Sequence, residues 1–114
     1  MTRWHVNLAA RFADFPKHQQ LLMVANELNR AEHLRTNPRE YRKALERAME
    51  LIDLLSSDDR WRPALGELRR GREMMAQLYI SPTPASTTAL QRTLIQLNAT
   101  AWNMLHPLGV KTKS

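Results

Sequence analysis

The sequence contains no cysteine and only three glycines, and it has no long apolar run. The lack of cysteine excludes disulfide frameworks, thiolate metal sites and cysteine nucleophiles. The longest uninterrupted apolar stretch is LLMVA, residues 21–25, whereas a membrane-spanning helix requires about 20 residues. Residues 1–15, MTRWHVNLAARFADF, also lack the continuous apolar core of a secretory signal. We therefore expect a soluble, cytoplasmic protein that does not contact membranes.

Length and composition indicate one folded domain. A chain of 114 residues has the usual size of a domain and can bury about two thirds of its unfolded surface. Its 25% charged and 43% hydrophobic residues are ordinary for a globular protein. The formal net charge is +6, from 17 Lys and Arg against 11 Asp and Glu. At neutral pH a surface with this excess attracts polyanions.

The apolar residues recur at intervals of three and four, which is the spacing that places side chains on one face of a helix. The alternation typical of strands is not sustained anywhere in the chain. Because the links between helices are short, consecutive helices must run antiparallel. The sequence therefore predicts a single all-α domain, an antiparallel up-down four-helix bundle with an additional short N-terminal helix. The predicted ranges are 3–14 for the short helix, 17–35, 38–56, 60–80 and 87–106 for the bundle helices, and 107–114 for a basic tail.

The clearest predicted boundary lies at the start of the helix over residues 38–56. Asn37 is a favourable N-cap, Pro38 suits the first helical position, and Glu40 stands where a capping box has its acid. The apolar stripe that follows is typical of a helix packed between neighbours. Its members are Tyr41, Leu45, Ala48, Ile52 and Leu55.

Residues that would indicate catalysis or metal binding are sparse. The histidines are His5, His18, His33 and His106, and each lies on a different predicted segment. The Glu-x-x-His motif of di-iron bundles does not occur. The sequence also contains no glycine-rich phosphate loop, no nucleophile elbow and no dinucleotide fingerprint. We predict no catalytic residue, no cofactor and no metal, and we favour a protein without enzymatic activity.

One pair of residues matches a known nuclease spacing. Arg11 and His18 have six residues between them. Small all-helical HEPN domains, many of them ribonucleases, carry Arg, four to six residues, then His, so the chain resembles them in architecture and in this spacing. That family keeps its motif near the last helix, commonly with a polar residue after the Arg, whereas here Phe12 follows. A HEPN-like nuclease is the least favoured function, and no catalytic residue is carried over.

Residues 60–73, RWRPALGELRRGRE, contain five arginines and two acids, Glu67 and Glu73. On a helix, one apolar stripe is formed by Trp61, Leu65, Leu68, Met75 and Tyr79. Arg62, Arg69 and Arg70 lie opposite this stripe, and Arg72 lies at its edge. Such a stretch is usually a solvated helix face, and the sharper alternative is a surface that binds nucleic acid. The candidate polyanion-binding residues are Arg60, Arg62, Arg69, Arg70 and Arg72.

The first predicted helix carries large apolar residues beside a bundle that already has a complete core. Exposed apolar patches mark partner surfaces, and a symmetric dimer is the commonest way to bury them. The alternative is that this helix folds back on its own bundle. We predict a non-catalytic protein that acts through protein–protein contact as a homodimer, with a nucleic-acid-associated regulator as the alternative. The candidate interface residues are Trp4, Leu8, Phe12 and Phe15.

Overall fold

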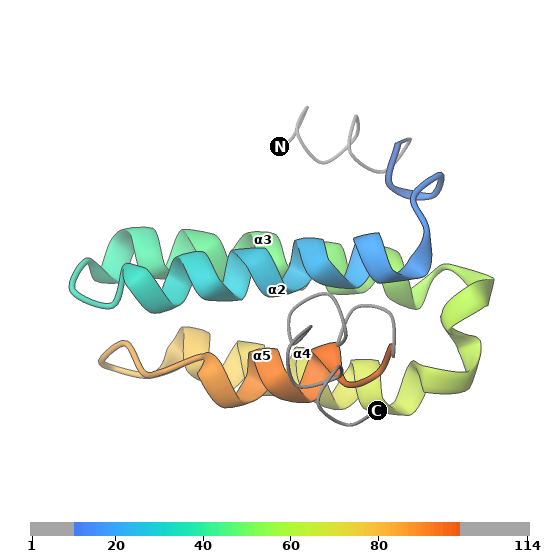
Figure 1. The fold of residues 1–114 in the computed structure, drawn as a ribbon. Helices are drawn as coiled ribbons and strands as arrows, with labels where there is room; N and C mark the ends of the chain where they lie inside the picture. The colour runs from blue at the N-terminus through green and yellow to red at the C-terminus, as the bar shows by residue number, and fades with distance from the viewer. Residues whose placement is uncertain (1–10, 99–114) are drawn as a thin grey trace, which may run out of the picture.

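The computed structural model describes residues 11–98, and these form four α-helices and one 3-10 helix without any strand (Figure 1). Successive α-helices reverse direction and lie side by side as a helical bundle (Figure 1). The all-α prediction is therefore confirmed. The elements are α2 (Lys17–His33), α3 (Pro38–Ser56), η1 (Asp59–Ala64), α4 (Leu65–Ile80) and α5 (Thr88–Ile95).

Helix α3 begins and ends where the sequence predicts. Asn37 caps it, because its side-chain oxygen accepts a hydrogen bond from the backbone N–H of Glu40 at 3.3 Å. Pro38 occupies the first helical position, where its missing N–H leaves no partner unbonded. The carboxylate of Glu40 does not close a capping box with Asn37 but pairs with Lys43 at 3.5 Å.

The prediction of one continuous helix over residues 60–80 is wrong. The segment starts as the 3-10 helix η1, and the α-helix α4 begins only at Leu65. Asp58 caps η1 by accepting the backbone N–H of Arg60 at 2.9 Å. Pro63 lies inside η1, where it has no N–H to continue an α-helical ladder.

The last helix is shorter than predicted. It ends at Ile95, and the chain then turns through hydrogen bonds from Leu97 N to Leu94 O at 3.0 Å and from Asn98 N to Ile95 O at 3.2 Å. The first bundle helix ends at His33, two residues before its predicted limit. Residues 99–106, the predicted tail and most of the predicted helix over residues 3–14 lie outside the described residues, although residues 11 and 12 are helical.

The core contains the apolar stripe predicted for residues 38–56. Every stripe residue named for α3 is buried, and α2 contributes Leu21, Val24, Ala25, Leu28 and Ala31. Each large apolar side chain that becomes fully buried stabilises the fold by about 1.5–3 kcal/mol. None of the helices in the described part of the chain is long and apolar enough to span a bilayer.

Helices α4 and α5 approach each other closely at Gly71. A Cβ atom placed on Gly71 would stand 2.9 Å from Cδ2 of Leu94, which is closer than real Cβ contacts. The side chain of Leu94 is buried and packs over the α4 backbone at this point. A side chain at position 71 would therefore require the buried Leu94 to shift.

Candidate functional site

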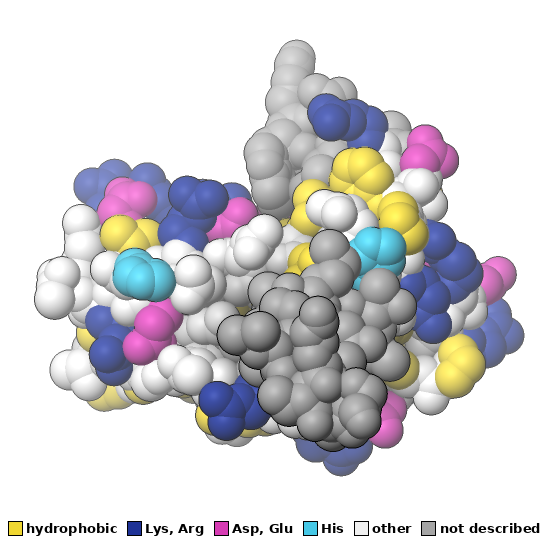
Figure 2. Space-filling model, in the orientation of Figure 1, with side chains coloured by type: hydrophobic (Ala, Val, Ile, Leu, Met, Phe, Trp, Pro, Cys, Tyr) yellow, Lys and Arg dark blue, Asp and Glu magenta, His cyan; other side chains and the backbone are white. Residues whose placement is uncertain are grey.

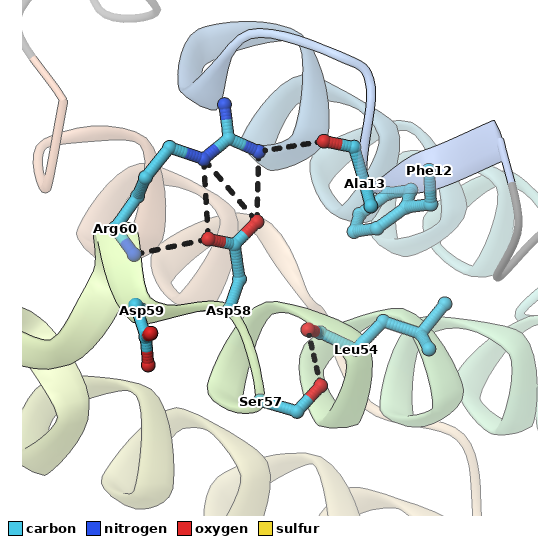
Figure 3. A pocket seen from close by; sticks show the side chains of 7 residues that line it. All are labelled: Phe12, Ala13, Leu54, Ser57, Asp58, Asp59 and Arg60. Carbon is cyan, nitrogen blue, oxygen red and sulfur yellow. Dashed lines mark hydrogen bonds and ion pairs between the residues drawn. The ribbon is translucent and has the colours of Figure 1, made fainter.

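Arg60 is engaged with its own neighbourhood in the chain. Its guanidinium donates to both carboxylate oxygens of Asp58, with Nη2–Oδ2 at 2.7 Å and Nε–Oδ1 at 3.1 Å (Figure 3). Nη2 also donates to the backbone oxygen of Ala13 at 3.1 Å. The hydrogen bond from Arg60 holds the pKa of Asp58 well below its usual range, and the same contact raises the pKa of Arg60. Arg60 thus ties the segment before α2 to the start of η1.

Two further arginines of the stretch also form ion pairs. Arg62 pairs with Asp59 at 2.9 Å on the surface of η1. Arg72 donates from Nε and Nη2 to the two oxygens of Asp53 on α3, at 3.0 and 3.1 Å, and this bidentate pair raises the pKa of Arg72. Three of the five predicted polyanion-binding residues are therefore occupied by acids of the same chain.

Arg69 and Arg70 are the remaining members of the predicted set. Both are exposed on α4, and neither forms an ion pair with another described residue. On the face drawn in Figure 2, basic and acidic side chains lie next to each other rather than in separate regions. The structure therefore does not gather the five arginines into one basic surface.

A buried polar network lies behind Arg60, and sequence analysis missed its central residue. Gln20 is fully buried, and its Nε2 donates to the backbone oxygen of Phe12 at 2.8 Å and to Asp58 Oδ2 at 3.3 Å. Its Oε1 accepts the indole N–H of Trp61 at 2.7 Å. Lys17 Nζ lies 4.7 Å from the centroid of the Trp61 ring, close enough for a cation–π contact. The available signal was that Gln20 precedes Val24 and Leu28 at helical spacing, on the buried stripe of α2.

A surface cleft of about 340 Å³ opens beside this network (Figure 3). Each polar side chain in its wall already has a protein partner: Asp58 with Arg60, Asp59 with Arg62, and the Ser57 hydroxyl with the backbone oxygen of Leu54 at 2.9 Å. These groups hold the corner between α3 and η1 together. The lining residues are Phe12, Ala13, Leu54, Ser57, Asp58, Asp59 and Arg60.

The other end of the bundle is fixed by side chains that bond to backbone groups. Arg42 on α3 donates to the carbonyls of Tyr79 and Ser81, both at 3.0 Å, and so satisfies acceptors at the end of α4. The Tyr79 hydroxyl donates to Glu46 at 2.5 Å, and this hydrogen bond raises the pKa of Tyr79. The hydroxyl of Tyr41 donates to the backbone oxygen of Ala85 at 2.8 Å.

Glu32 on α2 holds the start of α5. Its Oε1 accepts the backbone N–H of Thr87 at 2.7 Å and the hydroxyl of Ser86 at 3.0 Å. The bond from the Thr87 N–H is the main cause of a lowered pKa for Glu32. The Thr87 hydroxyl, in turn, donates to the carbonyl of Leu28 at 2.6 Å.

The histidines do not form a site in the part of the chain that the structure describes. His18 is partly buried in the first turn of α2, and Nδ1 of His33 lies 2.9 Å from the carbonyl of Asn29. His5 and His106 lie outside the described residues. Arg11 is exposed and no recorded bond joins it to His18. Within residues 11–98, no group of three or more His, Asp or Glu side chains could hold a metal ion.

The predicted interface residues divide between the core and regions that the structure does not describe. Phe12 is 2% exposed and packs in the core of its own chain, with its ring 6.3 Å from the ring of the partly buried Phe15. This placement corresponds to the alternative in which the N-terminal segment folds back. Trp4 and Leu8 lie outside the described residues. The homodimer itself stays a prediction.

Comparison of the chain with models of known protein families, with curated proteins and with solved structures finds no match. The contacts and exposed surfaces of the bundle are therefore the basis for its function.

Proposed function

We propose that this chain is a non-catalytic helical-bundle protein that acts through protein–protein contact as a homodimer. The observation that carries the proposal is the exposure of large apolar side chains on α4. Ile80 is 77% exposed and Met74 is 43% exposed, and among residues 11–98 these are the large hydrophobic side chains that face solvent. Burying one such side chain at an interface contributes about 1.5–3 kcal/mol, so a partner surface on α4 would gain stability.

The roles of the acidic residues support a structural rather than a catalytic protein. Asp58 binds Arg60 and Gln20, Glu32 binds the start of α5, and Glu46 binds Tyr79 on α4. Each of these carboxylates joins two segments of the fold. A cytoplasmic location is proposed with this function, because a chain without cysteine needs no oxidising compartment.

The solution mass tests the proposal. We expect light scattering of the full chain to give, at high protein concentration, twice the chain mass of 13.2 kDa. A mass of 13.2 kDa at every concentration would overturn self-association.

Nucleic-acid binding is the second candidate, and Arg69 and Arg70 favour it because both are exposed without an ion pair to a described residue. Binding of short duplex DNA across a salt series tests it. If both arginines contact phosphates, replacing them with Glu lowers the salt slope by about 2, at about 0.9 per phosphate. Arg92→Glu, at an exposed position on α5, is the matched control. Absence of binding at low salt would exclude this function.

A further inference from the structure

The outward side of α4 carries an exposed row of side chains, which we call the outer face of α4. At about 100° per residue, Gly66, Glu73, Gln77 and Ile80 lie in one narrow band along the helix, with Arg69 and Arg70 on either side of it. All six residues are exposed, whereas Leu68, Gly71 and Met75 form the buried side. The outer face therefore has no role in the core of the bundle.

Glycine at position 66 is not required by the fold of a single chain. Its φ is not positive, so its backbone conformation is open to any L-residue. A Cβ atom placed on Gly66 would have no atom of the described residues within 4 Å. Glycine inside a helix is less stable than alanine. Its lack of a side chain, at the second residue of α4 and on the outer face, leaves room for the close approach of another chain.

Ile80 provides the complementary shape on the same face. It lies fourteen residues after Gly66, about 21 Å along the helix at 1.5 Å per residue, and it is 77% exposed. Glu73 lies midway, seven residues from each. An antiparallel copy of α4 related by a two-fold axis through Glu73 would therefore place the partner's Ile80 over Gly66 and Ile80 over the partner's Gly66.

The charges on the outer face are also self-complementary under this symmetry. Arg69 and Arg70 both precede Glu73, by about 6 and 4.5 Å along the helix, and lie on opposite lateral edges of the band. In the antiparallel pair, the two arginines of one copy therefore lie on the C-terminal side of the other copy's Glu73, about 5 Å along the helix and one at each edge of the band. The four arginines offset the repulsion between the two glutamates at the axis.

We infer that the outer face of α4 pairs antiparallel with the same face of a second copy, about a two-fold axis at Glu73. The inference rests on the proposed homodimer and names its surface. An isologous interface of this kind uses one patch twice, which requires the patch to be self-complementary. A single helix pair is a small interface, so the dimer is expected to dissociate on dilution.

Charge reversal tests the surface. Glu73→Arg places three arginines from each copy at the axis, and Arg69→Glu with Arg70→Glu places three glutamates from each copy there. We expect both variants to be folded by circular dichroism and to scatter light as monomers, at concentrations where the unaltered chain and Arg92→Glu are dimers. Mixing the two variants in equal amounts is expected to restore the dimer mass, because each then meets opposite charges.

The outcomes separate this inference from the proposed function. A monomeric unaltered chain overturns both. A dimer whose mass is unchanged by either reversal leaves the homodimer standing and overturns the α4 surface. Monomeric variants that do not associate on mixing also overturn it, because loss of mass alone would then reflect something other than paired charges.

Gly66→Leu is an independent test with opposite effects on fold and assembly. Leucine is a better helix former than glycine and meets open space within the chain, so the urea midpoint of the monomer should rise. The same side chain fills the position that the partner's Ile80 would take, so the dimer should be lost. A variant that stays dimeric would contradict close approach at Gly66.

Discussion

Gln20 joins the segment before α2 to the start of η1, about 40 residues further along the chain. It contacts Phe12 before α2, Asp58 after α3 and Trp61 in η1, and its carbonyl and amide groups are both bonded. A buried amide is costly unless its polar atoms have partners, so the location of Gln20 in the core depends on all three contacts. The same contacts place Trp61 and Phe12 in the core.

Replacing Gln20 with Leu is expected to lower the free energy of unfolding by about 1–3 kcal/mol, the cost of one unsatisfied buried group. The Trp61 N–H would lose its buried partner, whereas the Phe12 carbonyl would keep the backbone N–H of Phe15 at 3.1 Å. Urea denaturation followed by circular dichroism measures the loss. Gln19→Leu, at the adjacent exposed position, is the control, and an equal effect of both substitutions would contradict the role of the network.

Asp58 is expected to make stability depend on pH in the acid range. Its pKa is lower in the folded chain than in the unfolded chain, because Arg60 donates hydrogen bonds to the carboxylate. A carboxyl of this kind stabilises the fold above its unfolded pKa of about 3.9, and the contribution is lost as pH falls below that value. Asp58→Asn should therefore cost about 1–2 kcal/mol at pH 7.

The cost of Asp58→Asn should decrease as pH falls below about 4, because the carboxyl of the unfolded chain then binds a proton while that of the folded chain is still ionised. Urea denaturation at a series of pH values measures it. Asp14→Asn, at an exposed position, is the control. A cost that stays constant from pH 7 to pH 2 would show that the charge of Asp58 is not the cause.

At the scale of the elements, local signals predicted α3 and failed at η1. Asn37, Pro38 and the apolar stripe act within the helix they define, so the sequence is sufficient to locate it. Trp61, which lies in the 3-10 helix η1, donates a hydrogen bond to Gln20 on α2, and this contact is distant in the sequence. Helix α5 ends at Ile95, before its predicted limit, and Leu97 in the following turn packs against the core. Neither distant contact can be derived from helical periodicity.

The two glycines of α4 are expected to respond to alanine with opposite signs. Gly66→Ala should raise the free energy of unfolding by about 1 kcal/mol, because the new Cβ meets open space and alanine favours the helix. Gly71→Ala should lower it by about 1–2 kcal/mol, because the new Cβ overlaps the buried side chain of Leu94. Urea denaturation at low protein concentration, where the monomer dominates, measures both.

These two substitutions serve as each other's control, since the change of residue and the helix are the same. Equal effects would mean that helix propensity alone decides the outcome and that α5 does not press on α4 at Gly71.

At the scale of the whole molecule, helix packing decides which charges are free. The pairing of Arg62 with Asp59, three residues apart, is visible in the sequence. The pairing of Arg72 with Asp53 joins two helices and is not. The sequence therefore left all five arginines of residues 60–73 as candidates for polyanion binding, while the structure leaves Arg69 and Arg70 without a described acidic partner.

Thermal stability is expected to depend on protein concentration if the outer face of α4 forms the dimer. Association stabilises the folded chain by mass action, so the Tm of the unaltered chain should rise as concentration increases. The Tm of Glu73→Arg should not change over the same range. Differential scanning calorimetry at several concentrations measures this, and a constant Tm for the unaltered chain at dimer-forming concentrations would contradict the link between folding and association.

The hydrogen bond from Thr87 to Glu32 holds the start of α5 against α2, and its loss would let α5 separate from the bundle. Helix α5 has eight residues, about 12 Å, and isolated helices of that length are not stable in water. Its amide hydrogens are therefore protected from exchange with solvent only while α5 stays packed on the bundle, through the bonds from Thr87 to Glu32 and Leu28 and through its buried side chains Leu90, Leu94 and Ile95. The amides of α5 should exchange together, in a cooperative opening that leaves the hairpin of α2 and α3 closed.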